Sequence, residues 1–231
     1  VDASGNDVSA VQSAPATSTV GVGFGFEDGA AGTTTVAGNS FSNTELQVED
    51  KTAALDLDAL LADNTFDRAV VVRNANGNVK DESGVQRIYS PISPAVAAAA
   101  PGETVEVHGG TYAETVTVDK ALTLQDASTP TVDAFEVAAD NVTIDGFTIT
   151  GGTVGGETAG IVVQSNTSGH TFSANNLGGP GSGTGLRVRS GVSGTEITEN
   201  NISGWAVGVA ADAPGQNVQV ADNCISGNTT A

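Results

Sequence analysis

The sequence contains very few of the residues that form cross-links, catalytic centres or bulky cores. Its 231 residues include one cysteine, one tryptophan, two tyrosines, two histidines and no methionine. The single cysteine, Cys224, excludes a disulfide within the chain, and we expect it to be a small buried hydrophobe rather than a reactive thiol. Because aromatic residues are scarce, the core has to be assembled mainly from small and β-branched side chains.

Basic residues are scarce as well. The chain has 8 lysines and arginines against 27 aspartates and glutamates, which gives a formal net charge of -19. Such a surface repels a phosphate backbone, and this argues against nucleic acid as a partner. No segment approaches the roughly 18 consecutive apolar residues of a transmembrane helix, so we expect no membrane insertion.

A short pattern recurs four times in the second half of the chain. Each copy reads apolar, two residues, a polar or aromatic residue, one residue, apolar, one residue, glycine. The copies are Ile144–Gly151, Phe172–Gly179, Ile197–Gly204 and Val220–Gly227. Their starting positions are 28, 25 and 23 residues apart, and a period of this size is typical of a solenoid.

Each period also carries a second strand-like run that is rich in β-branched or apolar residues. The second runs are 134–137, 160–163, 185–188 and 208–210. Helix-forming segments and the regular leucines of a leucine-rich repeat are missing from these periods. The layout therefore predicts a parallel β-helix, in which each strand pairs with its counterpart one coil away, roughly 4.8 Å distant.

Asparagine recurs at one position of the repeat, at Asn175, Asn200 and Asn223, and earlier in the chain at Asn39 and Asn64. Asparagine favours turns for local reasons, which would explain one residue in each period. Its fixed place between two apolar positions instead predicts an inward-pointing ladder, because stacked amides can donate and accept along the whole column.

The chain divides into four expected segments. They are a terminal extension or the end of a preceding coil at 1–30, β-helix-like coils at 31–75, a loop and short helix at 76–103, and the main β-helix at 104–231. Ser93 and Pro94 predict the start of an alanine-rich helix over about 93–100, and Pro101 predicts its end. Residues 55–61 suit a short helix or an excursion, and the carboxylates of Asp56 and Asp58 suit a solvated turn better than a calcium site.

A family resemblance begins where the strands of the main β-helix begin. The order is an alanine-rich helix, Pro-Gly-Glu-Thr-Val-Glu-Val, Gly-Thr-Tyr, Glu-Thr-Val-Thr-Val-Asp-Lys, Leu-Thr-Leu and then Ile-x-x-Asn-x-Ile-x-Gly units. It resembles the right-handed parallel β-helix proteins of the pectate-lyase-like superfamily, strongly over 85–230 and more weakly over 30–75. The resemblance implies an all-β, right-handed, single-stranded parallel β-helix with one short alanine-rich α-helix. It also implies a secreted or cell-surface location.

The resemblance does not imply a particular chemistry, because this fold hosts lyases, hydrolases, epimerases, adhesins and structural fibres. Lyases of the superfamily gather carboxylates around calcium beside a basic residue. The weak candidates here are Arg187 and Arg189, which lie on one side of a strand. The best carboxylate pair is Glu199 and Asp222, one coil apart. We therefore assign no catalytic residue and no cofactor, and no motif indicates calcium.

The two histidines do not suggest a catalytic centre either. His108 falls at an expected turn and His170 lies two residues before Phe172. Neither has an aspartate or cysteine at a spacing typical of catalysis, so we interpret both as structural.

Two functions fit these observations. The first is a non-catalytic structural or adhesive extracellular module, and the alternative is a carbohydrate-active β-helix enzyme with an unrecognised site. Residues 223–231 stop within the repeat pattern, whereas residues 1–6 and 30–75 are typical of late coils and 92–125 of an opening. We therefore expect copies to stack head to tail, as a filament subunit or a tandem surface repeat. Polysaccharide or other cell-surface components are further partners that the resemblance implies. A monomer whose first 30 residues fold back over one end is the other arrangement.

Overall fold

The computed structural model describes residues 2–9, 22–26, 35–42, 44, 46–51 and 55–230. The chain forms two compact units, Val1–Ala98 and Ala99–Ala231. Stacked parallel strands make a β-solenoid of about 8 turns, which confirms the predicted parallel β-helix. Of the segment 1–30, residues 1, 10–21 and 27–30 lie outside the described part of the chain.

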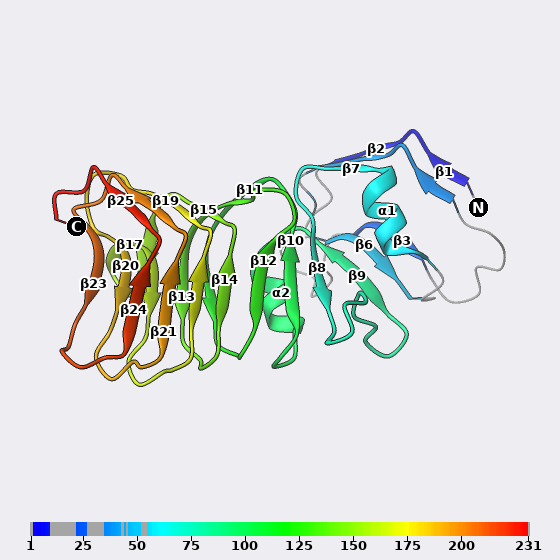
Figure 1. Cartoon of the computed structure of the whole chain (residues 1–231). Coiled ribbons are helices and arrows are strands. Elements are labelled where there is room, and N and C mark those ends of the chain that lie inside the picture. The colour runs from blue at the N-terminus through cyan, green and yellow to red at the C-terminus, as the bar shows by residue number, and fades with distance from the viewer. Residues whose placement is uncertain are drawn as a thin grey trace. The chain divides into compact units, whose positions relative to one another are not determined.

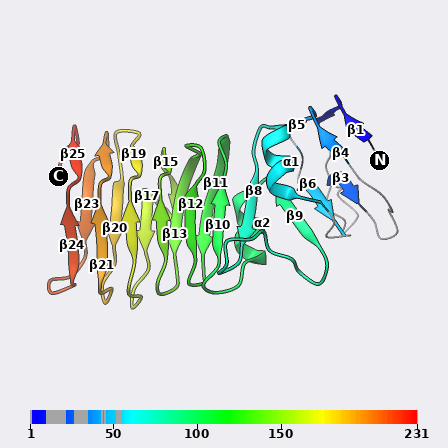
Figure 2. The same ribbon diagram turned by 45° about the vertical axis from the view of Figure 1, so that its right-hand side comes forward.

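The coils of the second unit have three faces (Figures 1 and 2). The first is a parallel sheet of β10 (Thr104–Val107), β12 (Thr123–Asp126), β14 (Thr143–Asp145), β18 (Thr171–Ser173), β21 (Thr195–Thr198) and β24 (Val218–Ala221). The second contains β15 (Thr148–Ile149), β19 (Asn176–Gly178), β22 (Asn201–Ser203) and β25 (Cys224–Ser226). The third contains β17 (Glu157–Val163), β20 (Thr184–Val188) and β23 (Val207–Ala211).

Two long strands connect the second and third faces. They are β11 (Thr111–Val118) and β13 (Thr131–Val137), which pair with each other in parallel. The start of β13 pairs with β15, and its end pairs with β17. A short strand, β16 (Gly152–Val154), leaves the coil and forms an antiparallel hairpin with β17. The hairpin lies within the longest repeat, so the additional residues of that repeat are placed outside the stacked coil.

The register of the first face confirms the repeat spacing. Ile144 pairs with Phe172, Phe172 with Ile197, and Ile197 with Val220. The first three side chains are fully buried, whereas Val220 in the last described coil is 47% exposed. Alternate side chains of each strand point inward, so an apolar residue at one register position stacks on its copies and forms a continuous core.

A tight corner joins the first face to the second in each coil. The residue before the corner asparagine has a left-handed backbone at Ala174 (φ 53°), Glu199 (φ 59°) and Asp222 (φ 56°). This conformation is unfavourable for residues with a side chain. Because three successive coils adopt it, the corner asparagines have to stabilise the turn through their own hydrogen bonds.

A buried tryptophan fills the interior beside the second and third faces. Trp205 is 1% exposed, and its indole Nε1–H donates to the carbonyl of Leu177 at 3.0 Å. The ring lies against glycines from neighbouring coils: a Cβ atom added at Gly160 or Gly185 would lie 3.2 or 3.1 Å from it. The core therefore combines one large side chain with glycines that leave room for it.

The described residues of the first unit form three groups of paired strands. Parallel pairs join β1 (Asp2–Ser4) to β4 (Thr35–Ala37), and β2 (Asp7–Ser9) through β5 (Ser40–Ser42) to β7 (Thr65–Phe66). The third group has the order β3 (Val22–Phe26), β6 (Leu46–Asp50), β9 (Gln86–Tyr89) and β8 (Val70–Arg73). Strand β9 is antiparallel to both β6 and β8. Strand β9 falls within 76–103, where the sequence suggested only a loop and a helix. The strand was not predicted because Ile88 is its single fully buried residue.

Two short helices complete the first unit. Helix α1 spans Leu57–Asp63, so residues 55–61 are not an irregular excursion, and Asp56 caps it by accepting from the Ala59 N–H at 3.1 Å. Asp58 pairs with Arg73 at 2.7 Å. Helix α2 spans Ile92–Ala98, close to the predicted 93–100, and packs on β8 and β9. The described residues therefore contain one more helix than the single alanine-rich one in the expected fold.

Candidate functional site

The structure brings the corner asparagines of the second unit into one continuous column. The backbone N–H and the side-chain Nδ2 of Asn175 both donate to Oδ1 of Asn200, at 2.9 and 3.0 Å. Asn200 donates in the same way to Oδ1 of Asn223, at 2.8 and 3.0 Å. In the coil before Asn175, Phe147 stands at this position, and its N–H donates to Oδ1 of Asn175 at 3.0 Å. The column therefore begins at a backbone amide and runs through three stacked side chains.

The first unit contains a column of the same design. Asn6 donates through its backbone N–H and Nδ2 to Oδ1 of Asn39, at 3.0 and 2.9 Å. Asn39 donates to Oδ1 of Asn64 through both groups at 2.9 Å. The predicted residues Asn39 and Asn64 are thus joined, and Asn6 is an additional member that the sequence reasoning missed. The sequence does contain the signal, because Ala3, Asn6 and Val8 have the same apolar, asparagine, apolar spacing as the later corners.

The last described coil exposes residues whose counterparts are buried in earlier coils. Val220 is the only exposed large hydrophobic residue in the described part of the chain, and Ile225 is half-buried although its partner Ile202 is fully buried. The prediction that Cys224 is buried is wrong: it is exposed. Cys224 pairs in register with Asn201. It follows the corner asparagine directly, and Asn176 and Asn201 at the same position of the two preceding coils are exposed as well.

Arg187 and Arg189 lie in a network of ion pairs on the third face. Arg187 contacts Glu157 and also Asp212, the latter at 3.1 Å, and Arg189 contacts the other oxygen of Glu157 at 2.8 Å. Hydrogen bonding to Asp212 raises the pKa of Arg187 above its ordinary value. Two arginines and two carboxylates therefore compensate one another in a partly exposed network.

Glu199 and Asp222 occupy equivalent positions, each directly before a corner asparagine. Both side chains are exposed, and no ion pair joins either of them to another described residue. Their column continues through Ala174 and Gly146, which carry no charge. The structure therefore places the two carboxylates one coil apart without a base or a third acidic group beside them.

Within the described ranges, no group of three or more histidine, cysteine, aspartate or glutamate side chains could hold a metal ion. His108 is half-buried at the end of β10 and contacts Glu106 at 3.1 Å. His170 is 1% exposed; its Nε2 lies 3.0 Å from Thr167 Oγ1, and Nδ1 has no hydrogen-bond partner. No helix of the described chain is both long and apolar enough to cross a membrane.

The stability of the protein should depend on the protonation of His170. Burial lowers the pKa of His170 below the ordinary 6.5, and the negative charge of Asp140 opposes part of this shift. The unfolded chain therefore binds the proton more tightly than the folded protein, so the free energy of unfolding should fall as the pH drops below about 6.5. Denaturant titrations at several pH values would measure this dependence.

A His170→Gln variant should lose less stability than the wild type between neutral and mildly acidic pH. His108→Gln is the matched control because that ring is half-buried at the surface. Equal pH dependence of the wild type and His170→Gln would contradict a role for this histidine.

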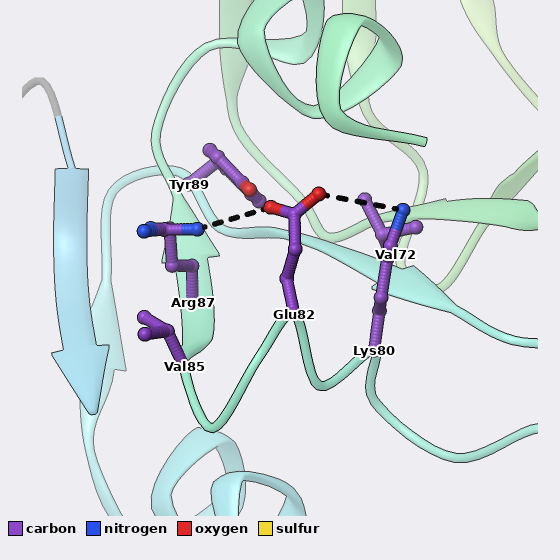
Figure 3. Close-up of a pocket in the computed structure, with 6 residues that line it drawn as sticks. All are labelled: Val72, Lys80, Glu82, Val85, Arg87 and Tyr89. Atoms are coloured by element: carbon purple, nitrogen blue, oxygen red, sulfur yellow. Dashed lines mark hydrogen bonds and ion pairs between the residues drawn. The ribbon is translucent and has the colours of Figure 1, made fainter. Parts of the chain in front are cut away.

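An open pocket of about 480 Å³ lies in the first unit. It is lined by Leu46, Glu49, Glu82, Arg87, Tyr89, Pro91, Pro94 and Ala98. Beside it, Figure 3 shows Arg87 reaching Glu82, which also contacts Lys80. Arg87 pairs with Glu49 at 2.9 Å as well, and burial raises the pKa of Tyr89. The cavity wall is therefore mainly apolar, and its charges pair with one another. No sequence pattern indicated it, because its residues come from three separate segments.

Searches with family models, among curated proteins and among solved structures find no match to this chain.

Proposed function

We propose that this chain is a non-catalytic structural or adhesive module of an extracellular assembly, in which copies stack head to tail along the coil axis. The observation that carries the proposal is the single register in which the coils stack within the chain, where Ile144, Phe172 and Ile197 form one fully buried column. Coils of a second copy would stack in the same register, as each coil covers its neighbour within the unit.

The distribution of charge supports a structural role over a catalytic one. The arginines of the third face pair with Glu157 and Asp212, and the carboxylates of Glu199 and Asp222 stand without a neighbouring base. A catalytic site usually contains titratable groups whose pKa values are shifted by their neighbours and which face a cleft. The resemblance to pectate-lyase-like β-helix proteins of the secreted and cell-surface type supports the extracellular location.

Sedimentation velocity and electron microscopy of the purified chain test this function. We expect species larger than a monomer whose size increases with protein concentration, and linear particles in the micrographs. The net charge of -19 opposes contact between copies, so assembly should increase with salt, which shortens the Debye length to about 10 Å at 0.1 M. Compact monomers alone, at high concentration and in screening salt, would contradict the proposal.

A further inference from the structure

Two neighbouring strands supply one side of the open pocket in the first unit. Strand β9 contributes Arg87 and Tyr89, which lie on the same side of the strand, whereas Ile88 between them belongs to the buried core. Strand β6 contributes Leu46, which pairs in register with Tyr89, and Glu49, which pairs with Arg87. The antiparallel register therefore places an apolar residue beside the aromatic ring and a carboxylate beside the guanidinium.

Helix α2 and the residue before it supply further apolar contacts. Pro94 and Ala98 are four residues apart, so they lie on one face of the helix. Pro91 directly precedes the first helical residue and also lines the pocket. The helix packs on β8 and β9, which holds this face against the strands. Because a proline side chain has no rotamer freedom to lose, a ligand can contact these residues at a low entropic cost.

Tyr89 is the only aromatic side chain among the described residues that line this pocket. It is half-buried, so part of the ring is accessible from the pocket. The charges of Arg87 and Glu82 act on its hydroxyl, and Figure 3 shows the three side chains pointing toward one another. A ligand that rests on the apolar face of the ring therefore meets hydrogen-bonding groups at its edge.

The charged groups of the pocket compensate one another. Arg87 pairs with Glu49 at 2.9 Å and with Glu82 at 3.3 Å, and Glu82 lies 4.0 Å from Lys80. A carboxylate has about four acceptor positions and a guanidinium has about five N–H donors. These groups can therefore bind the hydroxyl groups of a ligand while their ion pairs stay intact.

This combination of groups determines the chemical class of the ligand. An anion would meet two carboxylates, and the guanidinium between them is already paired. A cation would meet Arg87 and Lys80. A wholly apolar ligand would cover the charged groups without replacing the water that they lose. A neutral molecule with an apolar face and several hydroxyl groups suits both the ring and the ion pairs, and a pyranose sugar has this construction.

On the basis of the adhesive role proposed above, we infer that this pocket binds a neutral saccharide. The C–H face of one sugar ring lies on Tyr89, and its hydroxyl groups bind Glu82 and Arg87. The pocket volume of about 480 Å³ falls within the range of about 300 to 1,000 Å³ that is usual for small-molecule sites. Because the pocket is open, it accommodates a short part of a longer chain. A polymer of uronic acids is excluded as the ligand, since its carboxylates would face Glu49 and Glu82.

Saturation-transfer NMR with a panel of defined oligosaccharides tests this inference. The neutral members are cellotetraose, mannotetraose, xylotetraose and laminaritetraose, and the anionic member is tetragalacturonate. We expect saturation of the aromatic protons to reach the C–H protons of at least one neutral oligosaccharide, with a Kd on the order of 1 mM. Tetragalacturonate should give no transfer. If no neutral member binds, or if tetragalacturonate binds as well as the neutral members do, the inference is wrong.

Two substitutions in helix α2 locate the binding site. Ala98→Phe places a bulky side chain in the pocket and should raise the Kd by about tenfold or more. Ala97→Phe is the matched control, because Ala97 is the adjacent helical residue, is exposed and does not line the pocket. Its Kd should stay within about twofold of the wild type. Equal affinities of the two variants would place the saccharide elsewhere on the chain and contradict the inference.

Substitutions of Tyr89 test the contact with the ring. Tyr89→Leu keeps much of the apolar volume but removes the flat face, so it should raise the Kd by about tenfold. Tyr89→Phe keeps the face and should bind within a few-fold of the wild type. Equal Kd values of the two variants would show that the sugar does not lie on the ring. Binding of a proline-rich peptide by a chain that binds no saccharide would assign the pocket to a protein partner, and the inference would fail.

Sedimentation separates this inference from the proposed stacking. If the chain assembles but binds no neutral saccharide, the ligand of the pocket is wrong and the stacking stands. If the chain binds a neutral saccharide but stays monomeric in screening salt, the stacking is wrong and the ligand of the pocket stands.

Discussion

Replacing Asn200 with leucine should lower the free energy of unfolding by about 3 kcal/mol, because the change leaves several buried polar groups without partners. Asn200 is 1% exposed, and its Nδ2 donates to the carbonyls of Phe172 and Thr198 at 2.8 and 2.9 Å. Its Oδ1 accepts both donors of Asn175. Leucine is similar in size but can form none of these bonds. Chemical denaturation monitored by circular dichroism would measure the loss.

The adjacent residue provides a matched control. Asn201 is exposed and makes one side-chain contact, from its Nδ2 to Oδ1 of Asn176 at 3.1 Å. Asn201→Leu should change the free energy of unfolding by less than about 0.5 kcal/mol, as is usual at exposed positions. If the two variants unfolded at the same denaturant concentration, the column would have no part in stability.

Replacing Gly179 with alanine should destabilise the protein by about 2 kcal/mol through overpacking against a rigid wall. A Cβ atom at this position would lie 2.4 Å from Cδ2 of Trp205 and 2.7 Å from the carbonyl oxygen of Gly204. The ring is held by its hydrogen bond to Leu177, and the carbonyl belongs to the next coil, so neither can move without disturbing the stack. The intrinsic fluorescence of Trp205, the only tryptophan, would report the local rearrangement.

Gly178→Ala is the control for this substitution. A Cβ atom there would meet nothing within 4 Å, and alanine restricts the unfolded chain more than glycine does. We therefore expect Gly178→Ala to be neutral or slightly stabilising, with unchanged fluorescence. Unchanged stability in Gly179→Ala, or an equal loss in both variants, would contradict overpacking against Trp205.

The strand columns and the asparagine column could be predicted because both depend on a strict periodicity. A side chain in a coil points inward or outward according to its position, so the spacing of Ile144, Phe172 and Ile197 determined which residues stack. The same alternation of inward and outward positions explains why the prediction that Cys224 is buried was wrong. Asn176 and Asn201, its polar counterparts in register, already indicated an outward position.

Features that depend on contacts between distant segments were not predictable in this way. Strand β9 has a single fully buried residue, Ile88, and its antiparallel pairing follows from a chain reversal that leaves no periodic signal. The glycines at 160 and 185 were visible as strand boundaries, yet their function is to make room for Trp205, which lies in a later coil. Identifying such a function requires the fold itself, because size complementarity is a property of neighbours in space.

The hairpin of β16 and β17 shows how this scaffold tolerates changes of length. The repeat that contains it is 28 residues long, while the next two are 25 and 23, yet all of them keep one register on the first face. Gly155 and Gly156 form the exposed tip of this hairpin. A peptide inserted between them would leave the stacked strands intact. In the stacked array proposed above, such a peptide would be displayed once per subunit, at regular intervals.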